Sequence, residues 1–156
     1  MTDPSAVIEA LRRAGRMIAT AESLTGGALV ARLVDVPGAS DVVAGGAVCY
    51  SYAAKHRVLG VDAAELERTG AVTGSIARAM AEGALALYDC DIALATTGVA
   101  GPGPDERDTP AGTVFLALAR SNGRTLVREL DLDGDRAEVR AATVLHSLQL
   151  LADNLH

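Results

Sequence analysis

Short apolar runs that alternate with segments of helical spacing constrain the fold of this chain more than any other feature. Residues 17–20 form the first apolar run, and residues 25–36 follow with apolar side chains at helical intervals. Two more apolar runs, 42–51 and 91–97, are separated by segments with helical spacing. Strands that alternate with helices are typical of α/β domains built on a largely parallel sheet.

The last third of the chain has a different pattern. Residues 113–119 and 125–132 are two strand-like runs, and the Asn122-Gly123 pair between them is typical of a hairpin turn. A final helix is predicted over residues 135–155. We therefore expect an α/β fold, namely a three-layer α/β/α sandwich on a mixed, mostly parallel sheet with an antiparallel edge hairpin.

The apolar run over residues 42–51 is nearly continuous. Such a run is expected for a strand that is buried on both faces of the sheet. Within it, Gly45 and Gly46 would permit a bulge or the close approach of another backbone.

Charge and composition exclude several classes of protein. The net charge is −6, the pI is about 5.0, and only 3% of the residues are aromatic. Nucleic-acid binding needs a basic face or stacking aromatics, so we expect no nucleic-acid partner. No apolar run is long enough to span a membrane, and the first residues do not resemble a secretory signal. We expect residues 1–156 to form a single cytoplasmic domain, with Cys49 and Cys90 as buried free thiols.

Residues 20–27, TAESLTGG, place a serine where the first strand passes into a helix. Backbone N–H groups and the positive end of the helix dipole converge at such a position, which can bind a phosphate or stabilise an oxyanion. Ser23 is a candidate nucleophile, and Thr25, Gly26 and Gly27 are candidate donors. Ser23 or Thr25 could equally be an ordinary N-cap.

A nucleophilic serine needs a base. His56 and His146 have no acidic partner at a motif-like spacing, so we expect them on helix surfaces and find no support for a Ser-His-Asp triad. Lys55 lies just beyond the run 42–51 and is the only lysine in the chain. A lysine serves as a base where burial or nearby positive charge lowers its pKa from the ordinary value of ~10.4. The alternative is a solvated lysine on a helix.

A second glycine-rich segment, residues 96–103 (TTGVAGPG), follows the apolar run 91–97. Backbone N–H groups at Thr97, Gly98 and Gly101 could wrap a phosphate or a ribose. The alternative is a mobile loop whose glycines serve turns. The acidic residues that follow it are more typical of a solvated loop tip than of a metal site: Asp105, Glu106 and Asp108.

Arg136 and Arg140 lie four residues apart at the start of the last predicted helix, so they share a face. Together they could clamp a phosphate. Salt bridges to Asp135 or Glu138 are the competing interpretation.

Several motifs occur together in the order found in one known family. They are AESLTGG at 21–27, GGAVCYS at 45–51 with Lys55 beyond it, LGV at 59–61, GAV at 70–72, TGVAGP at 97–102, PAGTV at 110–114 and GDR at 134–136. With this ordered set, the chain resembles the CinA C-terminal domain family over nearly its whole length.

The resemblance implies a nicotinamide-nucleotide amidase, which converts nicotinamide mononucleotide to nicotinic acid mononucleotide and ammonia. It implies Ser23 as the nucleophile, Lys55 as the base and Tyr50 as an aid to proton transfer or orientation. The expected substrate, a pyridine mononucleotide, would be bound by Thr25, Gly26, Gly27, Gly45, Gly46, Thr97, Gly98, Gly101, Arg136 and Arg140. The resemblance implies no metal, no cofactor, and a homo-oligomer.

The sequence departs from the family pattern at a few positions. Leu24 stands where the family commonly has Cys, Tyr52 stands where it commonly has Asn, and the loop 102–109 contains fewer glycines than usual. The N-terminal domain that is often fused to this one is not in the sequence, so the resemblance predicts a stand-alone form. Two alternatives remain: a non-enzymatic nucleotide-binding module linked to competence or DNA damage, and an amidase for another small amide.

Overall fold

The computed structural model describes residues 2–156 and arranges them as helices around one five-stranded sheet. Its elements in chain order are α1 (Pro4–Ala14), β1 (Ile18–Glu22), α2 (Ala28–Val34), the 3-10 helix η1 (Ala39–Asp41), β2 (Val43–Val48), α3 (Tyr52–Leu59), α4 (Ala63–Thr69), α5 (Gly74–Tyr88), β3 (Ile92–Gly98), β4 (Thr113–Arg120), β5 (Thr125–Asp131) and α6 (Arg136–Ala152). None of the helices within residues 2–156 combines the length and the apolar character that crossing a membrane requires.

The sheet has the strand order β2-β1-β3-β4-β5. Strands β2, β1 and β3 are parallel, whereas β4 runs antiparallel to β3 and pairs with β5 as a hairpin. This arrangement confirms the predicted mixed sheet with an antiparallel hairpin at one edge. The carboxyl ends of the three parallel strands meet at one edge of the sheet, which is where ligands bind in folds of this kind.

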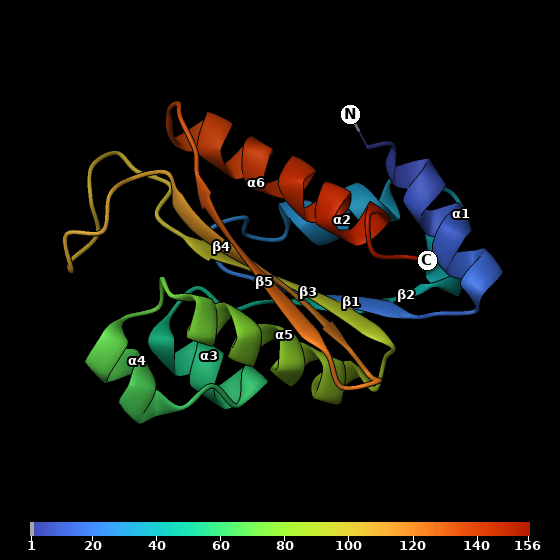
Figure 1. Ribbon diagram of the computed structural model, residues 1–156, viewed down its shortest axis with the longest axis horizontal. Coiled ribbons are helices and arrows are strands. Elements are labelled where there is room, and N and C mark those ends of the chain that lie inside the picture. The colour runs from blue at the N-terminus through green and yellow to red at the C-terminus, as the bar shows by residue number, and fades with distance from the viewer. Residues whose placement is uncertain (1) are drawn as a thin grey trace.

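Helices cover both faces of the sheet, so the predicted three-layer sandwich is confirmed (Figure 1). Helices α1, α2 and α6 lie on one face, and α3, α4 and α5 lie on the other. One apolar core joins α1, α2 and α6 to one face of the sheet. A second core, rich in alanine, joins α5 to the opposite face. Strand β1 is buried along its whole length because it lies between two strands and two helical layers.

The prediction that the run 42–51 is a strand buried on both faces is wrong. Strand β2 lies at the edge of the sheet, its residues alternate in burial, and Val48 at its end is 50% exposed. Gly45 and Gly46 are packing positions: a Cβ on Gly46 would lie 2.4 Å from Thr20 Oγ1, and one on Gly45 would lie 2.5 Å from the Tyr88 ring. The residues of β2 are small and apolar because neighbouring side chains pack closely against them. The sequence of this edge strand therefore resembles that of an interior strand.

Candidate active site

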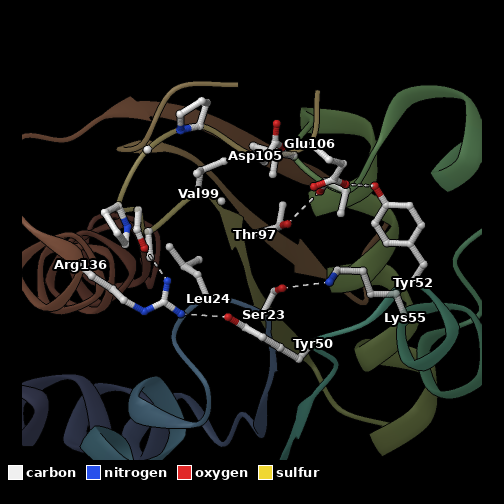
Figure 2. Close-up of a pocket in the computed structure, with 18 residues that line it drawn as sticks. Ser23, Leu24, Tyr50, Tyr52, Lys55, Thr97, Val99, Asp105, Glu106 and Arg136 are labelled. Atoms are coloured by element: carbon white, nitrogen blue, oxygen red, sulfur yellow. Dashed lines mark hydrogen bonds between the residues drawn. The ribbon is translucent and has the colours of Figure 1, made fainter. Parts of the chain in front are cut away.

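A cavity of about 290 Å³ opens at the carboxyl edge of the parallel strands (Figure 2). The segments that follow β1, β2 and β3 form its floor, α3 and α6 contribute one side each, and the loop after β3 lies over it. The volume is close to the lower end of the range for small-molecule sites, roughly 300–1,000 Å³.

Ser23 and Lys55 meet in this cavity, although 32 residues separate them in the chain. Lys55 Nζ donates to Ser23 Oγ at 2.9 Å and to the Cys49 carbonyl oxygen at 2.9 Å. The Cys49 N–H donates to the Glu22 carbonyl oxygen, which holds that segment beside β1. Ser51 caps α3 and thereby starts the helix so that Lys55, in its first turns, points into the sheet edge.

Lys55 is a buried amine without a carboxylate partner. Its side chain is among the largest that are fully buried, with 1% exposure, and none of the salt bridges found in residues 2–156 involves it. Burial disfavours the charged form and lowers the pKa of Lys55 from 10.5 to about 8, while the Cys49 thiol opposes this shift. The amine therefore gives up its proton far more readily than an ordinary lysine, and about a tenth of the molecules carry it uncharged at pH 7.

The turn that carries Ser23 ends in α2, which begins at Ala28 and not at Thr25 as predicted. Neither Ser23 nor Thr25 caps this helix, because its N-cap position is Gly27. The buried Glu22 carboxylate accepts the first N–H groups of the helix instead. The Gly26 N–H is also engaged, since it donates to the Ser23 carbonyl oxygen.

Arg136 stands on the opposite side of the cavity from Lys55, at the start of α6 (Figure 2). Its guanidinium donates to the Gly101 carbonyl oxygen at 2.6 Å and to the Tyr50 hydroxyl at 3.0 Å. The Tyr50 hydroxyl forms no hydrogen bond with Ser23 or Lys55 among the residues described. Arg136 is exposed and forms no salt bridge within residues 2–156, so its charge is available to an anion.

Arg140 does not line the cavity, although it shares α6 with Arg136. Its Nε donates to the Leu24 carbonyl oxygen at 2.8 Å, and its Nη2 donates to that of Thr25 at 3.1 Å. Neither arginine forms the salt bridges that were the competing interpretation. The two side chains do not form one clamp.

The structure thus divides the predicted site residues into two groups. Those that line the cavity are Ser23, Lys55, Tyr50, Thr97, Gly98, Gly101 and Arg136. Those that do not line it are Thr25, Gly26, Gly27, Gly45, Gly46 and Arg140, because their neighbours are other parts of the protein.

The sequence marked Tyr52 as a departure from the family pattern beside the site, but it did not predict that Tyr52 and Glu106 together form a wall of the cavity. The Tyr52 hydroxyl donates to Glu106 Oε1 at 2.9 Å, which links the start of α3 to the loop over the cavity. Arg107 fastens the same loop by donating to the carbonyl oxygens of Glu67 and Arg68 at the end of α4. The signal was a tyrosine at an unusual position, but its partner is 54 residues away and no local pattern marks it.

Fold and cavity together define an α/β/α domain with a serine at the carboxyl edge of its parallel strands. This serine is hydrogen-bonded to a buried lysine. A model of the CinA C-terminal domain matches residues 3–155. The chain therefore belongs to the CinA C-terminal domain family.

Similar proteins agree with this assignment. The CinA-like protein of Mycobacterium sp. (strain MCS) is 49% identical over 138 residues, which are 88% of this chain and 33% of that protein. The CinA-like protein of Mycobacterium tuberculosis (strain ATCC 25177 / H37Ra) is 46% identical over 141 residues, 90% of this chain and 33% of that protein. The chain spans about a third of the length of these curated relatives.

Solved structures show the same fold. The competence/damage inducible protein CihA from Agrobacterium tumefaciens has a TM-score of 0.92 and 39% identity, and the match covers 96% of this chain and 92% of that one. A CinA superfamily protein from Klebsiella pneumoniae has a TM-score of 0.94 and 36% identity, with 97% and 94% covered.

Proposed function

We propose that this protein is a nicotinamide-nucleotide amidase that converts nicotinamide mononucleotide to nicotinic acid mononucleotide and ammonia. The single observation that carries the proposal is the 2.9 Å hydrogen bond between Ser23 Oγ and the buried Lys55 Nζ. A serine is a weak nucleophile until a neighbouring base takes its proton. An uncharged, desolvated amine at this distance supplies that base.

The first half of the reaction forms an acyl-enzyme. Ser23 Oγ attacks the carboxamide carbon while its proton passes to Lys55 Nζ. The resulting ammonium of Lys55 then donates a proton to the amide nitrogen, the C–N bond breaks, and ammonia leaves. In the second half, water attacks the ester, Lys55 accepts its proton, and Ser23 Oγ regains a proton as the acid departs.

The oxyanion of this reaction needs donors near Ser23. Within residues 2–156, Gly26 and Gly27 already donate to Ser23 and Glu22, whereas the N–H groups of Leu24 and Thr25 donate to no protein group. We assign the oxyanion to the Leu24 N–H group, because Leu24 lines the cavity and Thr25 does not. This donor replaces the glycine donors suggested by the sequence. Each positioned donor contributes about 2.7–4 kcal/mol in sites of this kind.

The phosphate of the mononucleotide fits the side of the cavity that carries Arg136. This guanidinium is held in place by the Gly101 carbonyl oxygen and the Tyr50 hydroxyl, and it has no carboxylate partner within residues 2–156. Arginine presents a planar fork that matches phosphate oxygens. Thr97, Gly98 and Gly101 line the same cavity as this arginine and Ser23.

The proposal extends from the cavity to the domain, its compartment and its assembly. We take residues 1–156 as one amidase domain that acts in the cytoplasm as a homo-oligomer without a metal or cofactor. Membership of the CinA C-terminal domain family supports this proposal.

Ammonia release from nicotinamide mononucleotide tests the proposal. The purified protein should produce equal amounts of ammonia and nicotinic acid mononucleotide, and the Ser23→Ala variant should produce neither. Because only the uncharged amine accepts a proton, the rate should rise with pH through about 8, the pKa of Lys55. Turnover that survives in Ser23→Ala would contradict the proposal.

The same assay separates the alternatives. Tight binding of the mononucleotide without product would favour a non-enzymatic nucleotide-binding module. Faster hydrolysis of nicotinamide itself than of its mononucleotide would favour an amidase for another small amide, because free nicotinamide has no phosphate for Arg136.

A further inference from the structure

The Glu22 carboxylate is the most densely bonded polar group beside the cavity, yet it does not line it. The side chain is fully buried, with 0% exposure. Five donors lie within 3.2 Å of its two oxygens. They are the backbone N–H groups of Gly27, Leu29 and Val30 and the hydroxyls of Thr20 and Thr25.

Proton counting fixes the direction of the hydrogen bonds that reach Glu22. The Thr25 hydroxyl has one proton, and at 2.6 Å it donates that proton to Glu22 Oε1. Thr96 Oγ1, 2.8 Å from Thr25 Oγ1, must therefore be the donor in that pair. A chain of hydrogen bonds thus runs from β3 through Thr25 to the carboxylate at the end of β1.

Glu22 also replaces the cap that α2 lacks. The N-cap residue is Gly27, which has no side chain to accept the first N–H groups of the helix. A carboxylate at this end is favoured by the helix dipole and by the unpaired N–H groups. The helix start is therefore filled by the protein's own carboxylate and is closed to an anion of the substrate.

We propose that Glu22 is a positioning residue for Ser23. The residue next to it in the chain is the nucleophile, and Glu22 holds both the strand before the Ser23 turn and the helix after it. It thereby keeps Ser23 Oγ beside Lys55 Nζ and keeps the Leu24 N–H group available to the oxyanion. This inference rests on the proposed function, because it assigns Ser23 as the nucleophile.

The variant Glu22→Gln tests this assignment. Its amide NH₂ faces N–H or O–H donors whichever way it is turned, so the Ser23 turn must shift. We expect kcat for the mononucleotide to fall about 10²-fold, since a misplacement of about 1 Å costs that much, while KM changes less than about threefold. The pH midpoint near 8 should stay, because burial and Cys49 set the pKa of Lys55.

Ser147→Ala is the matched control. Ser147 is buried and donates to the Thr143 carbonyl oxygen in α6, so its removal also deletes a buried hydrogen bond. All variants are assayed below their melting temperatures. If Glu22 only stabilises the fold, kcat of Glu22→Gln will stay within about threefold of the wild type, as in Ser147→Ala, and the proposal is overturned.

A second readout does not depend on the substrate. Diisopropyl fluorophosphate phosphorylates a reactive serine with loss of fluoride, and intact mass follows the rate. If the wild type releases no ammonia but reacts at Ser23, the proposed substrate is wrong while Glu22 can still be tested. Glu22→Gln should then react about 10²-fold more slowly, and an unchanged rate would overturn the proposal.

A third variant pair applies if Glu22→Gln does not fold. Thr25→Val removes the hydroxyl that joins Glu22 to Thr96, and Thr25→Ser keeps it. We expect Thr25→Val to lose about tenfold more kcat than Thr25→Ser, because only the valine variant loses the hydrogen bond from the Ser23 turn to Glu22. Equal kcat values in the two variants would overturn the proposal.

Discussion

Two glycine-rich segments follow the neighbouring strands β1 and β3, and they differ in what their backbone groups bind. In the segment after β1, Gly26 and Gly27 donate to Ser23 and Glu22, and neither glycine lines the cavity. In the segment after β3, Gly98 and Gly101 line the cavity. The glycine N–H groups of the first segment are therefore bound within the chain, whereas the glycines of the second segment border the space for a ligand.

The difference shows that a glycine-rich turn at a helix start is not by itself a phosphate site. Its N–H groups bind an external anion only where the chain has not supplied one. Glu22 at the end of β1 is such an anion, so the segment is filled by its own carboxylate and holds Ser23, the proposed nucleophile.

The largest expected effect comes from Lys55, the proposed base for Ser23 in the first segment. Lys55→Met and Lys55→Arg should each lower kcat by about 10³-fold or more, because methionine has no proton acceptor and arginine keeps its proton. Steady-state ammonia release measures this. The control is Arg57→Met, an exposed basic residue two positions further along α3. Retention of wild-type kcat in Lys55→Arg would show that the amine is not the base.

Two arginines on α6 give the sharpest contrast, because one faces each segment. Arg136→Gln should raise KM for the mononucleotide about 10- to 100-fold with less change in kcat, since it removes a charge-assisted phosphate contact.

Arg140→Gln should instead lower kcat about tenfold with little change in KM, since Arg140 holds the Leu24 and Thr25 carbonyl oxygens of the turn. Steady-state kinetics over a range of substrate concentrations measures both variants. The same KM effect in both would mean that the two arginines act as one clamp, which would remove the distinction between the segments.

The smallest expected effect on activity comes from Gly46, which sequence reasoning placed in the substrate site. A Cβ there would lie 2.4 Å from Thr20 Oγ1 and 3.0 Å from Val30 Cβ. Gly46→Ala should therefore cost about 1–3 kcal/mol of stability, as overpacking does. KM should stay unchanged, because Gly46 does not line the cavity. Urea unfolding and a KM measurement check this, and a raised KM with unchanged stability would contradict it.

The fold was predictable because its signals are local. Asp3 with Pro4 and Gly15 bound α1 as capping rules require, and the Asn122-Gly123 pair lies between the strands of the predicted hairpin. The error on β2 arose because an apolar, small-residue run reads the same at an edge as in the interior of a sheet. Only the strand order decides between them, and that order depends on contacts distant in sequence.

The site was predictable only in part. Ser23, Lys55 and Arg136 line the cavity as expected, and their positions at strand ends and a helix start carried the signal. Glu22 was missed, although an acidic residue in an apolar strand before an uncapped helix is a usable sign. The Tyr52–Glu106 contact was not predictable, because it joins α3 to a long loop whose path no pattern sets.

The titration of Lys55 tests the central claim, an uncharged amine beside Ser23, most directly. Lys55 is the only lysine in the chain, so lysine labelled with ¹³C and ¹⁵N gives one side-chain NMR signal without ambiguity. We predict a midpoint at about pH 8, because burial lowers the pKa from 10.5. A midpoint near 10.5 would mean that almost none of the amine is uncharged at neutral pH, and it would contradict the assignment of Lys55 as the base.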